Sequence, residues 1–406
     1  MESKLYIALS FAMFMEYAIW GAWFPVLAAR LFGPLKMTGK ETGRIYATLP
    51  LACIVFPLVG GWLADKYVNT EWILVVAHLA GAVLLFLAAG KTTFKGLFSV
   101  LLLYSVFFAA TLPLVNSMMF HHLAKVYTDA DEIGKASGWI FLWAPVAWAL
   151  AGYFLTGWRW KFKTGEQGRD CLYFAAVLSL IMAVGCLFMP NTPPAPAAAD
   201  AVQAPIRDTL QMLGNTNFLV FVLASMVIAG LMQFYFQGTA QFMQDVGIPS
   251  KNVPASMAIA QAMQAIATFF LLGLLLKHLG FKWTLVIGAG CWLLLYLIYI
   301  GTREKLLIIP AQALHGLAYV FFIIVGQIYA KSVASEKILS TMQALMFAAT
   351  TGLGLLLGTQ LAGAVMDKFK SEGKFQWRRI FTVPAAIVLV CILVFMLFFK
   401  IPLGVK

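Results

Sequence analysis

Twelve long apolar segments run through this chain, and each is close to or above the length that a helix needs to cross a lipid bilayer. That length is about 20 residues. Breaks at charged residues, glycine and proline delimit the segments, which cover residues 5–32, 43–65, 72–90, 97–121, 134–156, 171–189, 217–243, 254–277, 283–301, 306–330, 339–366 and 377–399. We therefore predict an all-α polytopic membrane protein with twelve transmembrane helices.

The composition of the chain supports this class. Hydrophobic residues make up 62% of the 406 positions and charged residues 11%, which leaves too little polar surface to cover a soluble domain. The net charge of +12 is spread over short loops, so we interpret it as membrane-flank anchoring and expect no nucleic-acid partner. The first apolar run is too long for a signal-peptide core. The five cysteines show no CxxC motif and no nearby histidine at ligand spacing, so we expect no disulfide, no metal and no cofactor.

One long connection divides the twelve segments into six and six. Residues 190–215 begin with the Pro- and Ala-rich run PNTPPAPAAADAVQAP, which is typical of an extended, mobile linker. We predict an N-terminal six-helix bundle at residues 1–189, a cytoplasmic linker at 190–215 and a C-terminal six-helix bundle at 216–406. Two such halves indicate the major facilitator arrangement, in which a solute binds near the bilayer midplane. We expect a monomer, the default of that arrangement.

The end of the second segment carries a motif that fits this arrangement. The run Gly60–Lys66 (GGWLADK) resembles the superfamily signature between helices two and three, with Gly61, Asp65 and Lys66 at its characteristic positions. Small residues let helices approach closely, and the acid can cap or pair across a helix end. This motif and the linker favour cytoplasmic termini, whereas the distribution of Lys and Arg favours the opposite orientation. Four glycines of the eleventh segment are expected at close-packing positions: Gly352, Gly354, Gly358 and Gly363.

Amide side chains inside two consecutive segments mark a candidate solute site. Gln233, Gln237 and Gln241 lie four residues apart, and Gln261 and Gln264 lie three apart. These spacings place each set on one face of its helix. An amide without a partner in hydrocarbon is costly, so the side chains should face one another, a neighbouring helix or a watery cavity. Polar side chains also join helices in membrane bundles; for the whole set we favour a cavity that receives a solute.

Four stretches of the chain resemble the nucleoside:H⁺ symporter family. They are FMEYAIWGAWF at 14–24, GGWLADK at 60–66, LPLVNS at 112–117 and GLAYVFF at 316–322. The Trp-Gly-x-Trp of the first and the Ala-Asp-Lys of the second are the most specific pieces, and the resemblance extends over nearly the whole chain. It implies import of nucleosides coupled to protons, in a bacterial inner membrane.

The resemblance also implies roles for individual residues. Gln233 and Gln261 match positions at which the family binds the nucleoside through amides, and Tyr319 falls on an aromatic position. The family's carboxylates on the eighth and tenth segments fall at Gln264 and Val320, where this chain has no acid. The arginine of the fifth segment has no clear equivalent.

The residue types suit a neutral, hydrogen-bonding solute. A Gln side chain offers two donors and an acceptor, which match ribose hydroxyls and base edges. Trp20 and Tyr319 could stack on a base, a contact worth about 1–3 kcal/mol in nucleic-acid complexes. Asn116 and His315 could line the path, although a lone His in a packed helix is more often structural. Sugars bind amides and aromatic rings too, so a facilitator or symporter of another neutral solute stays open.

Glu16 is the only carboxylate deep inside a predicted span. Ionised acids in a bilayer are costly, so they face the bundle interior and usually have a function. Because burial raises the affinity of a carboxylate for protons, we expect Glu16 to bind the coupling proton in place of the missing acids. The alternatives are an acid near the water interface or one that is paired for packing. The spans show no nucleophile or metal cluster, so we expect no enzyme.

Overall fold

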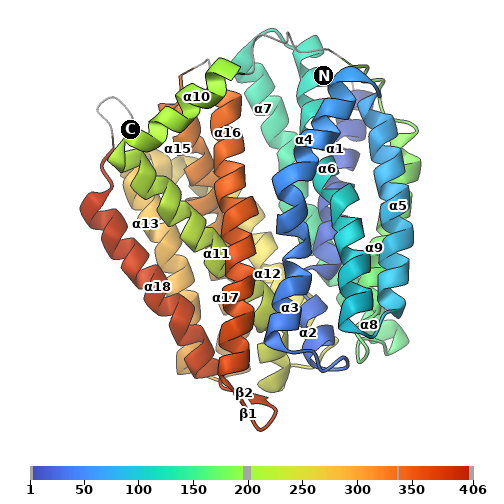
Figure 1. Cartoon of the computed structure of the whole chain (residues 1–406), viewed down its shortest axis with the longest axis vertical. Coiled ribbons are helices and arrows are strands. Elements are labelled where there is room, and N and C mark those ends of the chain that lie inside the picture. The colour runs from blue at the N-terminus through green and yellow to red at the C-terminus, as the bar shows by residue number, and fades with distance from the viewer. Residues whose placement is uncertain (1–2, 195–202, 336–337, 402–406) are drawn as a thin grey trace. The chain divides into compact units, whose positions relative to one another are not determined.

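The computed structural model describes residues 3–194, 203–335 and 338–401, and these residues are almost entirely helical (Figure 1). Ten helices of this described part are long and apolar enough to cross a membrane, which confirms the prediction of an all-α polytopic membrane protein. The count differs from the predicted twelve for two reasons. Val253–Gly301 forms one helical stretch of 49 residues, and Asp170–Cys186 has only 17.

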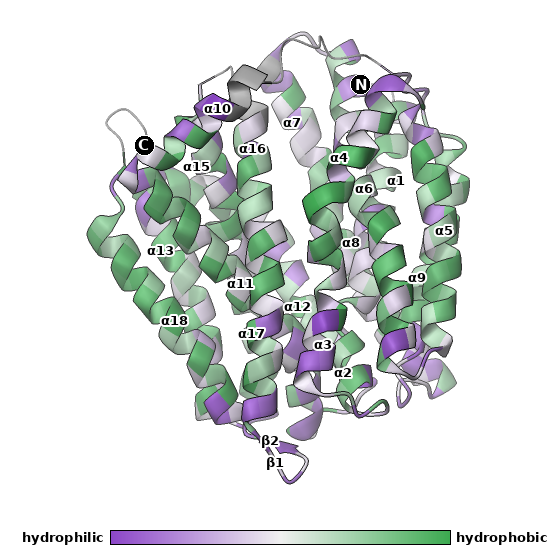
Figure 2. Cartoon of the chain, in the orientation of Figure 1, coloured by the Kyte–Doolittle hydropathy of each residue, from purple (hydrophilic) through white to green (hydrophobic). Residues whose placement is uncertain are grey.

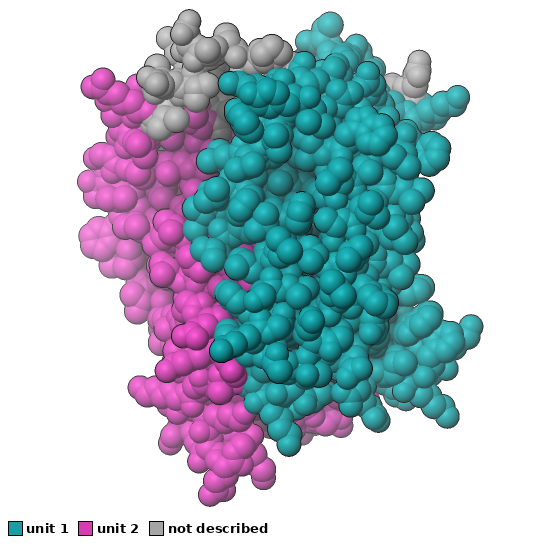
Figure 3. Space-filling view, turned by 45° about the vertical axis from the view of Figure 1, so that its right-hand side comes forward, with its two compact units in different colours: residues 1–37, 51–197, 250–258 teal, residues 38–50, 198–249, 259–406 magenta. Residues whose placement is uncertain are grey.

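The chain forms two compact units, which Figure 3 colours separately. Each unit contains most of one half of the sequence together with a short segment from the other half. Unit 1 comprises residues 1–37, 51–197 and 250–258, and unit 2 comprises residues 38–50, 198–249 and 259–406.

Unit 1 is built mainly from helices of the N-terminal half. Helix α1 packs against α8 and α9, and α5 packs against α6 and α9. The bounds of its helices are α1 (Ser3–Trp23), α2 (Leu27–Phe32), α4 (Thr48–Lys66), α5 (Thr70–Gly90), α6 (Phe94–Val126), α7 (Ala130–Phe141), α8 (Trp143–Phe162) and α9 (Asp170–Cys186). The first six residues of α12, 253–258, also belong to this unit.

Unit 2 contains the helices that carry the candidate amides. Helix α11 packs against α17 and α18, and α13 packs against α14 and α18. Its elements are α3 (Gly39–Tyr46), α10 (Gln203–Gln211), η2 (Met212–Gly214), α11 (Thr216–Asp245), α12 (Val253–Ile266), η3 (Ala267–Leu271), α13 (Leu272–Gly301), α14 (Lys305–Ala318), η4 (Tyr319–Ile324), α15 (Val325–Val333), α16 (Leu339–Phe347), η6 (Ala348–Gly354), α17 (Leu355–Lys368), the hairpin β1 (Lys370–Ser371) and β2 (Lys374–Phe375), and α18 (Trp377–Phe398).

Local sequence explains where α11 begins and ends. The side chain of Asn215 accepts hydrogen bonds from the backbone amides of Asn217 and Phe218, which would otherwise lack partners in the first turn. After the last turn Gly247 adopts φ of +88°, a left-handed conformation that glycine enters without steric cost. The helix that carries Gln233 and Gln237 therefore has defined ends.

Several long helices of unit 2 are not regular along their length. The stretch Val253–Gly301 bends at Gly280, whose backbone has φ of 67° and ψ of −177°. Three π-helical turns, η3, η4 and η6, interrupt otherwise α-helical segments. Such turns occur mostly as single insertions and often lie at functional sites. Tyr319 is the first residue of one of them.

Glycines bring α11 into backbone contact with α17 and with η6, the π-helical turn directly before it. A Cβ atom added at Gly358 would lie 2.1 Å from the carbonyl oxygen of Gly230, and one at Gly354 would lie 2.6 Å from the carbonyl oxygen of Met226. A side chain at either position would therefore push the two helices apart. At Gly363 the added Cβ would lie 2.3 Å from the carbonyl oxygen of Gly39. The sequence prediction of close packing is confirmed at these three glycines of the eleventh segment.

Hydropathy varies along the length of the helices in each unit. Figure 2 shows apolar residues along the middle of helices such as α5, α9 and α18, and hydrophilic residues gathered toward the helix ends and the connecting loops. Large apolar side chains such as Phe86, Val177 and Leu397 are exposed. In a protein that crosses a membrane these side chains face lipid, because lipid tails solvate them as well as a protein core does.

Candidate functional site

The amides of α11 lie in the interior of unit 2. Gln233 and Gln237 are fully buried, one helical turn apart, near the surface where α11 meets α17. The side-chain nitrogen of Gln237 donates to the carbonyl oxygen of Thr359 at 3.4 Å. The side-chain oxygen of Gln237 and both polar atoms of Gln233 have no hydrogen-bond partner among the described residues. Buried amide atoms are normally satisfied, so these three are available to a polar ligand.

The third amide of the α11 series behaves differently. The side chain of Gln241 is only half-buried, and its nitrogen donates to a carboxylate oxygen of Asp245 at 2.7 Å, at the end of the same helix. Gln241 therefore extends the predicted stripe of amides, but part of its hydrogen-bonding capacity is used within α11.

The amides of α12 lie beside α14. A Cβ atom at Gly316 would lie 1.9 Å from the carbonyl oxygen of Ala260 and 2.8 Å from the backbone nitrogen of Gln264, so only glycine permits this approach of the two helices. Gln261 is buried and its side-chain oxygen lacks a hydrogen-bond partner among the described residues, whereas Gln264 is half-buried.

His315 links α14 to α11 and α13. Its Nδ1 accepts a hydrogen bond from the indole nitrogen of Trp292 at 3.1 Å, and its ring stacks on Tyr235 with centroids 3.8 Å apart and an interplanar angle of 11°. Because Nδ1 is the acceptor, the proton of the neutral ring is assigned to Nε2. Phe236 packs edge-on against the same ring at 5.4 Å. Tyr319 follows one turn later and is half-buried.

The remaining predicted solute residues lie in unit 1. Trp20 packs on Phe108 and Trp148, with ring centroids at 6.2 and 5.1 Å, and its indole nitrogen has no hydrogen-bond partner in the described part of the chain. A Cβ at Gly21 would lie 2.6 Å from Trp148, which explains the glycine in Trp-Gly-x-Trp. Asn116 is half-buried on α6 and its side-chain oxygen is likewise unsatisfied by described residues.

Glu16 lies in a buried polar cluster of unit 1. The hydroxyl of Thr111 lies 2.6 Å from one carboxylate oxygen, and Nε2 of His78 lies 3.0 Å from the other. The side chains come from α1, α6 and α5, and none of the three is more than 1% exposed. Sequence reasoning missed His78, since a single His in an apolar segment gives no spacing signal. Glu16 is thus a paired acid, which was one of the alternatives left open.

The motif residues lie at the end of α4. Gly60 provides the close approach, because a Cβ there would lie 2.8 Å from the side chain of Ala110, whereas a Cβ at Gly61 would meet no atom within 4 Å. Asp65 and Lys66 are exposed in the last turn.

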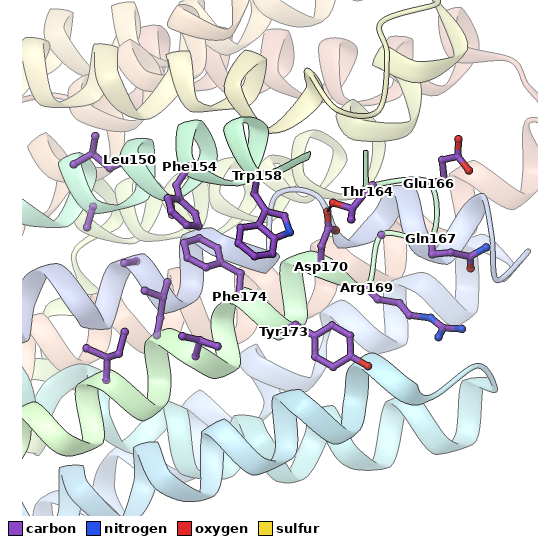
Figure 4. A pocket seen from close by; sticks show the side chains of 18 of the residues that line it. Leu150, Phe154, Trp158, Thr164, Glu166, Gln167, Arg169, Asp170, Tyr173 and Phe174 are labelled. Carbon is purple, nitrogen blue, oxygen red and sulfur yellow. Dashed lines mark hydrogen bonds between the residues drawn. The ribbon is translucent and has the colours of Figure 1, made fainter. Parts of the chain in front are cut away.

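A cavity of about 870 Å³ lies elsewhere in unit 1, between α1, α8, α9 and the loop before α9. Figure 4 shows Phe154, Trp158 and Phe174 along its wall, with polar residues such as Thr164 and Gln167 at one end. None of the candidate amides lines it. An apolar wall cannot replace the hydrogen bonds of a polar solute, so the unsatisfied amides mark the better candidate site. The described residues include no cluster of three or more His, Cys, Asp or Glu that could hold a metal ion.

Comparisons with known proteins agree with one another. The family model described as "Nucleoside H+ symporter" matches residues 3–403. The putative nucleoside transporter YegT of Escherichia coli is 30% identical, over 97% of this chain and 93% of that protein. The nucleoside permease NupG of Escherichia coli is 25% identical, over 98% and 96% of the two chains.

The fold has a solved counterpart as well. A crystal structure of the nucleoside transporter NupG superposes with a TM-score of 0.87 at 24% identity, covering 98% of this chain and 100% of that one. A bacterial homologue of the lysosomal transporter Spinster reaches a TM-score of 0.75 at 13% identity, covering 97% and 96% of the two chains. These two structures show a major facilitator type of fold. The family model and the relative at 30% identity show a membrane transporter and not an enzyme: the chain belongs to the nucleoside H⁺ symporter family.

Proposed function

We propose that this protein imports nucleosides together with protons. The observation that carries the solute class is the set of buried, unsatisfied amide atoms on Gln233, Gln237 and Gln261. They offer both donors and acceptors without a formal charge, and this matches a neutral solute rich in hydroxyl and amide groups. Membership in the nucleoside H⁺ symporter family and similarity to two nucleoside transporters support the same solute.

The unsatisfied amides also give a physical basis for selectivity. A buried donor or acceptor without a partner costs about 1–3 kcal/mol. A nucleoside that satisfies these groups removes that cost, whereas an analogue without the matching hydroxyl leaves a group unpaired and is rejected. We assign the amide contacts to Gln233, Gln237, Gln261 and Gln264. Stacking and rim contacts are assigned to Tyr319, Trp20 and Asn116.

The proposed architecture has twelve membrane crossings. Dividing the long stretch Val253–Gly301 at Gly280 and adding the shorter apolar helix Asp170–Cys186 supports this number. We assign six crossings to residues 1–189 and six to residues 216–406, with 190–215 and both termini in the cytoplasm of a bacterium. In this scheme a monomer transports by alternating access, and the run containing Gly61, Asp65 and Lys66 acts in the conformational change.

Uptake into proteoliposomes tests the proposed solute. Purified protein is reconstituted, and entry of radiolabelled uridine and adenosine is measured by counterflow, which needs no proton gradient. We expect saturable entry that unlabelled nucleosides compete for and glucose does not. Counterflow of radiolabelled glucose, with none of either nucleoside, would instead support the alternative of a sugar carrier. Absence of nucleoside counterflow would contradict the proposal.

A further inference from the structure

The buried cluster around Glu16 has the parts of a proton-binding site. Glu16 is fully buried in α1, and its two carboxylate oxygens face different partners, the Thr111 hydroxyl at 2.6 Å and His78 Nε2 at 3.0 Å. The carbonyl oxygen of His78 accepts a hydrogen bond from the hydroxyl of Ser179 at 2.8 Å, which fixes α5 against α9 at this level. Four helices of unit 1 therefore position one acid and one base within reach of a single proton.

No carboxylate among the described residues of unit 2 occupies a comparable position. Among its described residues, the acids lie at helix ends, in the short helix α10 or in loops: Glu41, Asp208, Asp245, Glu304, Asp367 and Glu372. The positions that correspond by resemblance to family acids are Gln264 and Val320, neither of which can take up a proton. A proton carried by this chain near the middle of the membrane needs another group, and unit 1 contains one.

The charge of the cluster is set by the protonation of Glu16 and His78 themselves, and not by neighbouring charged residues. Besides His78, the titratable side chains of Tyr104 on α6 and Cys186 on α9 interact electrostatically with Glu16, and Tyr and Cys are ordinarily neutral at physiological pH. Other charged residues of the helices packed around it lie in first or last turns: Glu71 of α5, Lys95 and Lys125 of α6, Asp131 and Glu132 of α7, Arg159 and Lys161 of α8, and Asp170 of α9. Lys135 lies in the second turn of α7, where its side chain is exposed.

We propose that Glu16 and His78 together bind the coupling proton, and that the acceptor of the Thr111 hydroxyl proton changes when this coupling proton binds. This inference rests on the proposed function, because it names the proton site of that transport cycle. One proton enters and the net charge of the pair changes from −1 to zero. It resides on His78 Nε2 or on a carboxylate oxygen of Glu16, and no other bond forms or breaks.

Thr111 accommodates both states of the pair. Its hydroxyl oxygen lies 2.6 Å from Glu16 and 2.7 Å from the carbonyl oxygen of Phe108, but a hydroxyl has one proton to donate. When Glu16 is ionised, the hydroxyl donates to the carboxylate. When the oxygen that faces Thr111 is protonated, it donates to Thr111, whose own proton turns to the Phe108 carbonyl. The Thr111 hydroxyl and the carboxylate oxygen that it faces therefore keep a hydrogen bond in either state.

Transport measurements on variants separate coupling from solute binding. Glu16→Gln and His78→Asn are compared with wild type and with a control, Glu71→Gln. Wild-type Glu71 is a carboxylate at the start of α5 that accepts hydrogen bonds from Asn69 and Thr192. For Glu16→Gln we expect uridine counterflow within about twofold of wild type and a loss of at least tenfold in accumulation driven by an inward proton gradient. Glu71→Gln should retain both activities. Gradient-driven accumulation in Glu16→Gln at the wild-type level would overturn the inference.

A second readout is independent of transport and of the solute. Infrared difference spectra of the purified wild-type protein across a pH step should contain the band of a buried protonated carboxyl group, and Glu16→Gln should lack it. The band should shift in Thr111→Val, which keeps the side-chain shape and removes the hydroxyl. A spectrum unchanged by Glu16→Gln would refute the site. Failure of nucleoside counterflow in wild type with an intact carboxyl band would refute the proposed solute and leave the proton site standing.

Discussion

Replacing Gln233 by leucine should weaken nucleoside binding without destabilising the protein. Gln233 is fully buried, and neither its side-chain oxygen nor its nitrogen finds a partner among the described residues. If both atoms bind the solute, the substitution removes two hydrogen bonds of about 1 kcal/mol each, and about 2 kcal/mol corresponds to a loss of roughly 30-fold in affinity. In the solute-free protein the substitution instead relieves the desolvation cost of two unsatisfied groups, about 1–3 kcal/mol for each.

Gln312 offers a matched control in the same unit. It is equally buried, but its nitrogen donates to the hydroxyl of Tyr299 and the carbonyl oxygen of Ile308, and its oxygen accepts from Tyr299. Gln312→Leu should therefore lower the free energy of unfolding and leave the nucleoside affinity unchanged.

Two assays check this pair of substitutions: uridine affinity from counterflow competition, and thermal unfolding in detergent without solute. We expect Gln233→Leu to lose affinity and to unfold at or above the wild-type temperature. If Gln233→Leu lowers the unfolding temperature and keeps its affinity, Gln233 joins helices and the reasoning from unsatisfied amides is wrong.

Further substitutions test other parts of the account. Gly358→Ala places a Cβ 2.1 Å from the Gly230 carbonyl oxygen and should lower the free energy of unfolding by about 1–3 kcal/mol, measured as a lower unfolding temperature. Gly61→Ala, whose Cβ would have no atom within 4 Å, should leave the unfolding temperature unchanged. Equal behaviour of the two variants would contradict the packing argument. Buried Arg159 and half-buried Asp170 form an ion pair with two contacts of 2.7 and 2.8 Å. Asp170→Asn should therefore cost about 1–3 kcal/mol of unfolding free energy, and an unchanged unfolding temperature would show that the pair is dispensable. Trp292→Phe removes the hydrogen bond to Nδ1 of His315; nitrogen-15 shifts of the His315 ring should then show loss of the single tautomer, and unchanged shifts would contradict our assignment of the proton to Nε2.

The helices of this protein could be predicted well from the sequence, because apolar length and terminal signals are local. The predicted segment 217–243 corresponds to α11 at Thr216–Asp245, with Asn215 as its cap. The predicted segment 377–399 corresponds to α18 at Trp377–Phe398. The predicted break between the eighth and ninth segments is instead a bend at Gly280. A pattern of hydrophobicity does not distinguish a bend from a loop.

The site could be predicted only where one helix carries the signal. Spacing alone indicated that Gln233 and Gln237 share a face, and both are buried. It could not show that Gln241 pairs with Asp245 or that Gly60, not Gly61, makes the close helix contact. These outcomes depend on which side chains a neighbouring helix presents.

The partner of Glu16 lay beyond prediction for the same reason. Glu16, His78 and Thr111 come from three helices that are distant in sequence, and only tertiary packing brings Thr111 and His78 within 2.6 and 3.0 Å of the Glu16 carboxylate. Likewise, the π-helical turn that begins at Tyr319 arises inside an ordinary apolar segment. Helix propensity gives no signal for such a turn.

Proton movement driven by nucleoside is the most direct test of coupled import. Wild-type proteoliposomes in weakly buffered medium, with equal pH inside and outside, receive external uridine while the external pH is recorded. Coupled import predicts alkalinisation of the medium, absent with glucose and abolished by a protonophore. Uridine entry without any change in external pH would contradict proton coupling and identify the protein as a facilitator.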